Sequence, residues 1–393
     1  MVKEEMDTVA HNEVAIIVNG VTGRMGYRQH LLRSLLAIRA DGGVELASGR
    51  RVTIRPILLG RNAEKLSAIA TQHDIADWTT DLDAALADPA VDIYFDSQLT
   101  SARVPAVKKA IAAAKHIYAE KPIAETSEEC AELIKLAEQA GVKNGVVHDK
   151  LYLPGLRKLA QLIDSGFFGR ILSVRGEFGY WVFEGDWTPA QRPSWNYRAE
   201  DGGGIVSDMF PHWNYVLENL FGSVHSVYAQ AVTHIDERVD ENGKTYRATA
   251  DDAAYGVFEL DGGVIAQLNS SWDVRVNRRE LVEFQVDGTH GSAVVGLFGA
   301  KIQHRNATPR PTWNPDVEDD HDYYADWQQV PEREPMGNGF RAQWEDFIRH
   351  VVEDGPHPYD FRSGARGVRL AELALRSSET GQRIAIPVDP TEA

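Results

Sequence analysis

The chain has 393 residues, 41 of them Lys or Arg and 58 Asp or Glu, so its formal net charge is −17, and its apolar fraction of 43% is ordinary for a globular enzyme. The acidic balance argues against nucleic acid and anionic membranes as partners, because both attract basic surfaces. The single cysteine, Cys130, excludes an intrachain disulfide, and the absence of a secretory or membrane-spanning apolar run leads us to expect a cytoplasmic protein.

Strand and helix patterns alternate through the first third of the chain. Apolar runs typical of buried strands occupy residues 14–18, 53–59, 91–95, 116–119 and 143–148. Helical patterns occupy residues 27–39, 63–73, 78–87, 102–114 and 127–140, and residues 44–51 are typical of a polar hairpin or loop. This alternation predicts a parallel sheet with right-handed crossovers, an α/β Rossmann domain, over residues 1–149.

A glycine turn with the spacing G-x-x-G-x-x-G joins the first strand to the first helix. Glycine lets the backbone turn sharply and approach a pyrophosphate without a Cβ in the way. The helix N-terminus then offers N–H groups and a positive dipole end to the phosphates. A turn between any buried strand and helix can look similar. The dinucleotide cradle that we predict is formed by Gly20, Thr22, Gly23, Arg24 and Met25.

The pattern changes after residue 150. Helical patterns occupy residues 154–165, 205–221, 340–353 and 364–379, and strand patterns occupy residues 171–181 and 384–388. Alternating segments within residues 226–303 predict one larger antiparallel sheet. Residues 183–201 and 308–339 are irregular and rich in Pro and Trp. We therefore expect a second, α+β domain over residues 150–393, built on a large open, mainly antiparallel sheet.

A lysine follows the strand at 116–119, in the sequence Glu120-Lys121-Pro122. Ligands of open α/β sheets bind outside the carboxyl ends of the strands, so Lys121 is placed to reach a cofactor or substrate. An exposed surface position is the ordinary alternative for a lysine.

A carboxylate and an imidazole lie four residues apart in the predicted helix 205–221. This spacing puts Asp208 and His212 on one face. A carboxylate beside an imidazole can orient it for general acid–base work. The alternative is a pair that caps or solvates the start of an exposed helix.

The glycine turn, the A-E-K-P sequence ending at Pro122 and the triple glycine followed by D-x-x-x-H together resemble the Gfo/Idh/MocA oxidoreductases. The resemblance covers nearly the whole chain and implies oxidation or reduction of a sugar or cyclitol hydroxyl with NAD(H) or NADP(H). It implies that Lys121 contacts the nicotinamide and the reacting hydroxyl. Asp208 would bind a neighbouring hydroxyl and His212 would exchange the hydroxyl proton. Glu120 and Pro122 would shape the nicotinamide site.

The end of the second strand carries Gly60-Arg61-Asn62 and no carboxylate that could bind the ribose hydroxyls of NAD. Arg61 could pair with the 2′-phosphate of NADP, or stack on the adenine of either cofactor. The resemblance favours NAD, which we expect, with NADP as the alternative. Ser97 and Gln98 are further predicted cofactor contacts, and no metal site is predicted.

The predicted substrate wall combines a lysine with a loop rich in aromatic side chains and arginine. Aromatic rings pack against the apolar face of a sugar, and Arg or Lys binds anionic groups. Alternatively, such a loop packs on its own domain or on a partner subunit. The predicted substrate contacts are Lys150, Tyr152, Arg192, Trp195, Asn196, Tyr197 and Arg198.

Three functions remain open at this point. The first is a dehydrogenase that oxidises a sugar or glycoside hydroxyl, which we expect at C3. The second is a redox-neutral, NAD-dependent glycosidase acting on an anionic glycoside such as a sulfoquinovoside, a chemistry found in the family. It needs a base for the C2 proton, for which Tyr152, Tyr180 and Tyr197 are candidates. The third is a nucleotide sensor without catalysis. An exposed sheet face usually needs covering, so we also expect a homo-oligomer, a dimer or tetramer.

Overall fold

A computed structural model describes residues 12–180, 193–276, 278–308, 316, 321–322, 325–332 and 337–387. The chain divides into two compact units, each described here by itself. The first comprises Met1–Ala124, Glu128–Val147 and Gly337–Ser363. The second comprises Glu125–Ser127, His148–Met336 and Gly364–Ala393.

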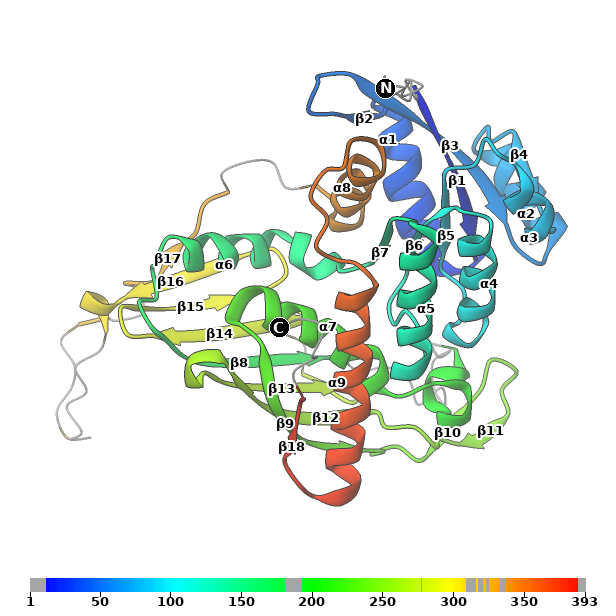
Figure 1. The fold of residues 1–393 in the computed structure, drawn as a ribbon. Helices are drawn as coiled ribbons and strands as arrows, with labels where there is room; N and C mark the ends of the chain where they lie inside the picture. Colours follow the sequence, from blue (N-terminus) through cyan, green and yellow to red (C-terminus); the bar gives the residue numbers. More distant parts are fainter. Residues whose placement is uncertain are drawn as a thin grey trace. The chain divides into compact units, whose positions relative to one another are not determined.

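The first unit is built on a seven-stranded sheet (Figure 1). Its strands are β1 (Glu13–Asn19), β2 (Val44–Glu45), β3 (Arg51–Leu59), β4 (Asp77–Thr79), β5 (Ile93–Asp96), β6 (His116–Ala119) and β7 (Asn144–Val146). The order is β2-β3-β1-β5-β6-β7, and β4 pairs with β3. All pairs are parallel except the hairpin β2–β3. The predicted Rossmann sheet is confirmed, and its strand order reverses between β1 and β5, where such sheets bind dinucleotides.

Helices cover both faces of this sheet. They are η1 (Met25–Leu36), wound as a π-helix and continued by α1 (Ala37–Ala40), α2 (Ala63–Gln72), α3 (Leu82–Ala87), α4 (Thr100–Ala112), α5 (Ser127–Ala140) and α8 (Gly339–Glu353). Side chains of η1, α2 and α8 share one hydrophobic cluster with the sheet. Helix α4 packs on β5 and β6 and contributes nothing to that cluster, so it covers the opposite face.

Two differences from the sequence predictions concern this unit. Residues 78–87 were predicted as one helix, but Trp78 lies in β4 and the helix starts only after Asp81, whose carboxylate accepts from Ala84 N at 3.0 Å. Aromatic and β-branched residues suit a strand, and Asp suits an N-cap. The predicted second domain is also interrupted, because Trp344 and Phe347 of α8 pack on Tyr118 of β6, with ring centroids 4.6 and 4.7 Å apart.

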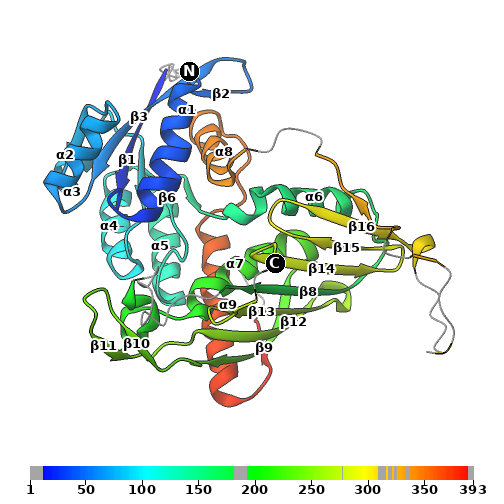
Figure 2. The same ribbon diagram turned by 180° about the vertical axis from the view of Figure 1, so that it is seen from behind.

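The second unit is built on a nine-stranded mixed sheet, and Figure 2 shows its strands from behind. Its order is β17-β16-β15-β14-β8-β13-β12-β9-β18, in which only β13 and β8 pair in parallel. The strands are β8 (Ile171–Gly179), β9 (Val224–Val232), β12 (Ala253–Leu260), β13 (Ile265–Ser271), β14 (Val282–Gly288), β15 (Gly291–Val295), β16 (Ala300–His304), β17 (Gln328–Gln329) and β18 (Ile384–Ala385). A separate hairpin pairs β10 (Glu237–Val239) with β11 (Thr245–Arg247). The predicted large, mainly antiparallel sheet is confirmed.

Three long helices pack on one face of the nine-stranded sheet. They are α6 (Pro154–Asp164), α7 (Ile205–Phe221) and the part of α9 (Phe361–Thr380) that belongs to this unit. Short 3₁₀ helices are η2 (Asp149–Tyr152), η3 (Ser194–Tyr197), η4 (Ala199–Asp201), η5 (Asp261–Gly263) and η6 (Arg305–Ala307). In the described part of the chain, no helix is both long enough and apolar enough to cross a membrane.

Candidate functional site

The predicted cofactor residues gather along one edge of the first unit's sheet. The glycine turn follows β1, Arg61 follows β3, Ser97 follows β5 and Lys121 follows β6. These four strands are neighbours in the order β3-β1-β5-β6 and run parallel, so the loops leave the sheet at their shared carboxyl edge. Sequence reasoning placed each loop by itself, and the strand order brings them together.

The turn after β1 and the start of η1 each require a glycine, Gly20 and Gly26. Gly20 has φ +80°, and a Cβ there would lie 2.8 Å from the Ser97 carbonyl carbon. A Cβ on Gly26 would lie 2.6 Å from the Gly20 carbonyl oxygen. Thr22 and Arg24 are exposed beside the start of η1. The turn therefore brings bare backbone and a helix N-terminus to the surface at the carboxyl edge, which fits the pyrophosphate of a dinucleotide.

A buried ion pair that the sequence reasoning missed supports the loop after β5. Arg103 Nε lies 3.1 Å from Asp96 Oδ1, and both side chains are at most 2% exposed. The same guanidinium donates to the carbonyl oxygens of Gln98, at 2.8 Å, and of Pro122. Asp96 also accepts from Gln98 N at 3.0 Å. This pair therefore ties the predicted cofactor loop after β5 to the Lys121–Pro122 segment, whose peptide bond is cis.

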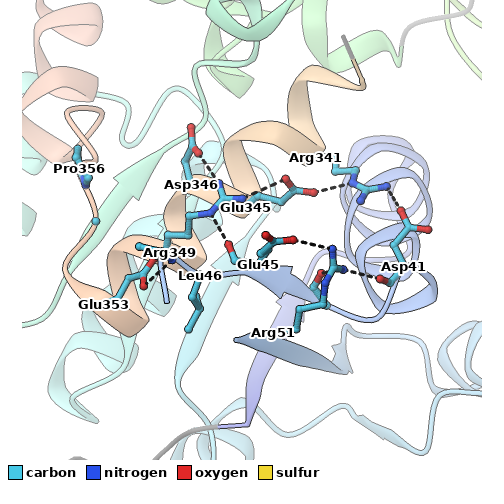
Figure 3. A pocket seen from close by; sticks show the side chains of 13 residues that line it. Asp41, Glu45, Leu46, Arg51, Arg341, Glu345, Asp346, Arg349, Glu353 and Pro356 are labelled. Carbon is cyan, nitrogen blue, oxygen red and sulfur yellow. Dashed lines mark hydrogen bonds and ion pairs between the residues drawn. The ribbon is translucent and has the colours of Figure 1, made fainter. Parts of the chain in front are cut away.

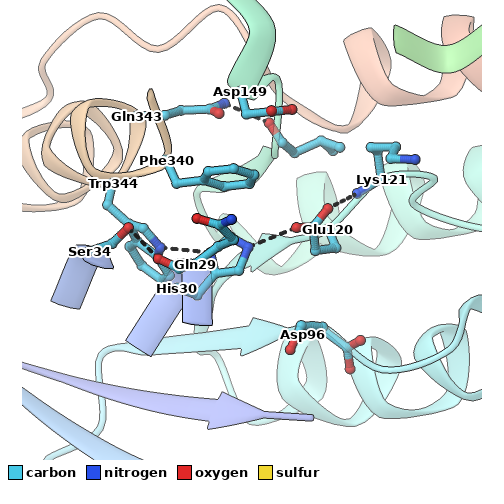
Figure 4. Close-up of polar contacts among 12 residues, drawn as sticks. Gln29, His30, Ser34, Asp96, Glu120, Lys121, Asp149, Phe340, Gln343 and Trp344 are labelled. Atoms are coloured by element: carbon cyan, nitrogen blue, oxygen red, sulfur yellow. Dashed lines mark hydrogen bonds and ion pairs between the residues drawn. The ribbon is translucent and has the colours of Figure 1, made fainter. Parts of the chain in front are cut away.

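Glu120 is buried and held by His30 of η1, as Figure 4 shows. The Trp344 indole N–H donates to His30 Nδ1 at 3.0 Å. Because indole is only a donor, the neutral ring of His30 carries its proton on Nε2, which donates to Glu120 Oε1 at 2.8 Å. The second oxygen of Glu120 accepts from the backbone N–H of Lys121 at 3.2 Å.

These contacts decide the charge of Glu120. Burial by itself raises the pKa of this carboxyl, but the hydrogen bond from His30 and the nearby positive charges outweigh burial and lower its pKa from the usual value. The positive charges include Lys121 and Arg103. An anionic carboxylate therefore precedes Lys121 at the end of β6.

A pocket of about 810 Å³ in the first unit lies elsewhere, between β2, the first residue of β3 and α8 (Figure 3). Its three arginines each have a carboxylate partner: Arg51 with Glu45 at 3.1 Å, Arg341 with Glu345 at 2.8 Å and Arg349 with Asp346 at 2.9 Å. Arg51 begins β3, so this pocket lies away from the carboxyl edge that carries the cofactor loops.

In the second unit, α7 carries both Asp208 and His212, and its first turn is anchored by Asp251. The backbone N–H of Val206 donates to Asp251 Oδ2 at 2.8 Å, and that of Ile205 to the Asp251 carbonyl oxygen at 2.9 Å. Gly204 must be glycine here, since its φ is +121° and a Cβ would lie 2.6 Å from Asp251 Oδ1. Burial raises the pKa of Asp251 to about 6.

His212 is buried and contacts a tyrosine one turn further along α7. Its Nδ1 lies 2.6 Å from the Tyr215 hydroxyl and 3.8 Å from Asp149 Oδ1. The Tyr215 hydroxyl donates to Asp149 Oδ1 at 3.3 Å and accepts from Lys150 N at 3.3 Å. Sequence reasoning missed Tyr215 and Asp149. The i, i+3 spacing of His212 and Tyr215 was a readable signal, whereas the contact with Asp149 spans 66 residues.

The predicted substrate residues divide by burial. Lys150 and Tyr152 lie half-buried in η2, and Trp195 and Arg198 are also half-buried. Arg192 lies outside the described residues, and Tyr180 is half-buried at the end of β8.

Two members of the predicted loop are buried instead. Asn196 donates to the Pro193 carbonyl oxygen at 2.9 Å. The Tyr197 ring lies in the hydrophobic core, with the Arg238 guanidinium 3.9 Å from its centre. These two side chains support the loop from inside. Among the described residues no group of three or more His, Cys, Asp or Glu side chains is arranged to hold a metal ion.

Comparisons with known proteins match both halves of the chain. The profile of the Gfo/Idh/MocA oxidoreductase family, NAD-binding Rossmann fold, matches residues 42–148, and that of the Gfo/Idh/MocA C-terminal domain matches residues 156–294. The D-xylose dehydrogenase of Paenarthrobacter nicotinovorans is 59% identical over 378 residues, which cover 95% of this chain and 97% of that protein. The 1,5-anhydro-D-fructose reductase of Ensifer adhaerens is 28% identical over 259 residues, or 66% of this chain and 70% of that protein.

Solved structures show the same fold. A levoglucosan dehydrogenase in complex with NADH and L-sorbose superposes with a TM-score of 0.78 at 19% identity, covering 96% of this chain and 99% of that one. At this identity the likeness shows the architecture of the chain.

Proposed function

Because the chain belongs to the Gfo/Idh/MocA family of oxidoreductases and carries its NAD-binding Rossmann domain, we propose that it transfers a hydride from a sugar hydroxyl to NAD. The NAD prediction is confirmed by the family match. The observation that carries the proposal is the carboxyl edge of the first sheet. There the loops after β1, β3, β5 and β6 form a cradle with a lysine at one end.

The cofactor supplies one thing when bound: a nicotinamide carbon that accepts a hydride. The glycine turn after β1 would hold the pyrophosphate, and Ser97, Gln98 and the Glu120–Pro122 segment would bound the rest of the cofactor. Arg61 is exposed after β3, so it remains available to a 2′-phosphate, and NADP is the alternative cofactor.

Three side chains carry the acid–base chemistry in this proposal. Lys121 polarises the reacting hydroxyl, Asp208 binds a neighbouring hydroxyl, and His212 takes the hydroxyl proton as the hydride leaves the same carbon. A buried imidazole held through Nδ1, as His212 is, suits a base that must return to one orientation after each turnover.

The substrate is a sugar, and a pentose of the D-xylose type is the first candidate because of the 59% identity to a D-xylose dehydrogenase. Two carbons are open to oxidation. In a glycoside the anomeric oxygen is substituted, and we propose C3, in line with the resemblance. In a free aldose the C1 hydroxyl is also available, and its oxidation gives a lactone.

A redox-neutral glycosidase is the second candidate function. It is favoured by two half-buried cations, Lys150 and Arg198, because Lys and Arg bind the anionic group of a glycoside such as a sulfoquinovoside. Each cation also has a carboxylate 3.9 Å away, Asp149 beside Lys150 and Asp201 beside Arg198. Transient oxidation at C3 would acidify the C2 proton, and Tyr152 is the half-buried tyrosine next to Lys150 that could remove it. Tyr197 lies in the core.

The test measures NADH formation from NAD, and NADPH from NADP, over a panel of free pentoses, hexoses and glycosides that includes a sulfoquinovoside. The proposal predicts turnover of a sugar that falls at least about 100-fold in Lys121→Met and His212→Gln, while NADH binding persists. Matched controls are Lys109→Met and His225→Gln, which change exposed ion-paired residues. Binding of NADH without any sugar turnover would favour a sensor instead.

A further inference from the structure

We propose that Tyr215 and Asp149 are positioning residues for His212, and that together they keep its proton on Nδ1 so that Nε2 accepts the substrate proton. The reaction that this inference concerns is the hydride transfer of the proposed function, on which it rests. The arrangement of the three side chains lies entirely within the second unit.

His212, Tyr215 and Asp149 follow one another in a chain of hydrogen bonds. Helix α7 places His212 and Tyr215 on one face, and the 2.6 Å contact between Nδ1 and the hydroxyl oxygen is a short hydrogen bond. Asp149, at the start of η2, lies beyond the hydroxyl at 3.3 Å. His148 stacks on the face of the Tyr215 ring, with ring centroids 4.1 Å apart and ring planes inclined by 21°.

Three hydrogen bonds meet at the Tyr215 hydroxyl. The Tyr215 hydroxyl has one proton to donate, and its oxygen already accepts the backbone N–H of Lys150. If that proton goes to Asp149, the imidazole must donate from Nδ1, and each of these three contacts then joins one donor to one acceptor. If it goes to His212 instead, the Asp149 carboxylate faces the phenol oxygen at 3.3 Å with no proton between them. The arrangement in which Tyr215 donates to Asp149 and His212 donates from Nδ1 is therefore favoured. It leaves Nε2 of His212 without a proton, so that its lone pair can accept one.

Proton transfer to His212 creates a positive charge close to Asp149. When the sugar O–H bond breaks, its proton binds Nε2, and the electron pair of the adjacent C–H bond leaves as hydride to NAD, so the sugar is oxidised by two electrons. The imidazolium then lies with Nδ1 3.8 Å from the Asp149 carboxylate. Of the neighbouring titratable groups, His148 stacks on Tyr215, and Lys150 Nζ lies 3.9 Å from the same Asp149 oxygen. The Asp149 carboxylate stabilises the imidazolium.

The experiment compares pH–rate profiles of the full chain and the variants Tyr215→Phe and Asp149→Asn. Tyr215→Phe keeps the ring that stacks on His148 and removes only the hydroxyl. We expect kcat to fall about 10- to 100-fold, with KM for the sugar changed less than about threefold, and the acid limb of the profile to move. Because the three groups act as one chain, the double variant should lose no more than the worse single variant. Lys109→Met, which changes an exposed ion-paired residue of α4, is the control.

A second readout does not depend on turnover. Imidazole ¹⁵N chemical shifts of the wild-type protein, with His212 assigned through His212→Gln, report which ring nitrogen carries the proton. The proposal predicts Nδ1–H in the wild type and loss of that preference in Tyr215→Phe. Nε2–H in the wild type, or a Tyr215→Phe profile equal to that of Lys109→Met, overturns it. A wild type inactive on every sugar with the Nδ1–H tautomer intact would refute the proposed function alone.

Discussion

At the scale of single residues, Glu120 shows how a motif residue acquires its role from a partner far away in sequence. The chain from Trp344 through His30 to Glu120 fixes one imidazole tautomer and supplies a donor to a buried carboxylate. An unpaired buried carboxylate is costly, so the donor is what allows an anion immediately before Lys121. The His30 contact spans 90 residues, which is why the local E-K-P sequence did not reveal it.

Replacing His30 tests this contact. His30→Phe removes the donor to Glu120, and we expect a loss of unfolding free energy on the order of 2 kcal/mol together with weaker NADH binding. His30→Gln can still donate to Glu120 and should retain most of the unfolding free energy and most of the affinity for NADH. Denaturant unfolding and NADH fluorescence titration measure the two quantities, and equal behaviour of Phe and Gln at this position would contradict the role given to the hydrogen bond.

At the scale of elements, the sequence predicted those helices and strands that form because of the pattern of their own residues. The apolar runs of β1 and β3, the helix 127–140 and the helix 205–221 follow from periodicity and turn residues, and they are confirmed. Two features depended on packing between distant segments and could not be read locally. One is Trp78, which lies in a strand beside β3. The other is the unit to which α8 belongs: the helix over residues 340–353 was predicted as part of the second domain, but its Trp344 packs in the core of the first unit.

The residues of the candidate site also divide into those that local sequence predicts and those that only the folded chain brings together. Lys121, Asp208 and His212 were predicted from motif and spacing, and their roles stay predictions. The supporting side chains Arg103 and Asp149 were not found, because their contacts depend on the folded chain. Tyr197, predicted as a substrate contact, lies in the core, since an aromatic residue in a loop fits either place.

His116, the first residue of β6, leads to a prediction of how the stability of the fold depends on pH. Burial, and then the charge of Lys143, lowers the pKa of His116 from 6.5 to about 4, and the backbone N–H of Lys143 donates to its Nδ1 at 3.0 Å. Between pH 6.5 and 4 the unfolded chain therefore binds a proton that the folded chain does not. This contribution to stability is complete above pH 6.5 and is lost as the pH falls to about 4.

The variant His116→Gln does not titrate. We expect its unfolding free energy to fall less steeply than that of the wild type between pH 6.5 and 4, by on the order of 2 kcal/mol over the window. Denaturant titrations at three pH values measure the difference. His225→Gln, an exposed histidine, serves as the control, and parallel slopes for wild type and His116→Gln would refute the prediction.

At the scale of the whole molecule, the outer face of the nine-stranded sheet carries apolar side chains on adjacent strands. Tyr228 of β9 pairs directly with Val257 of β12, and Tyr255 and Ile265 lie on the same face; all four are 38–44% exposed. Such a patch favours association, and we expect a homodimer or homotetramer built on this face.

Light scattering coupled to size exclusion measures the assembly. The wild type should elute as a dimer or tetramer of the 43.6 kDa chain. Val257→Asp, which puts a charge at the centre of the patch, should shift it toward the monomer, whereas Lys109→Met should not. A monomeric wild type at micromolar concentration would show that this face has no second copy of the chain as its partner.

The most direct test of the central claim is the stoichiometry of NADH and oxidised sugar formed from D-xylose and NAD by the wild-type protein. Absorbance follows NADH, and NMR of the product locates the new carbonyl. The account predicts one NADH per oxidised sugar, with a carbonyl at C1 or C3. Glycoside cleavage in the panel with no net NADH would identify a redox-neutral hydrolase, and no reaction of any sugar with bound NAD would contradict the account.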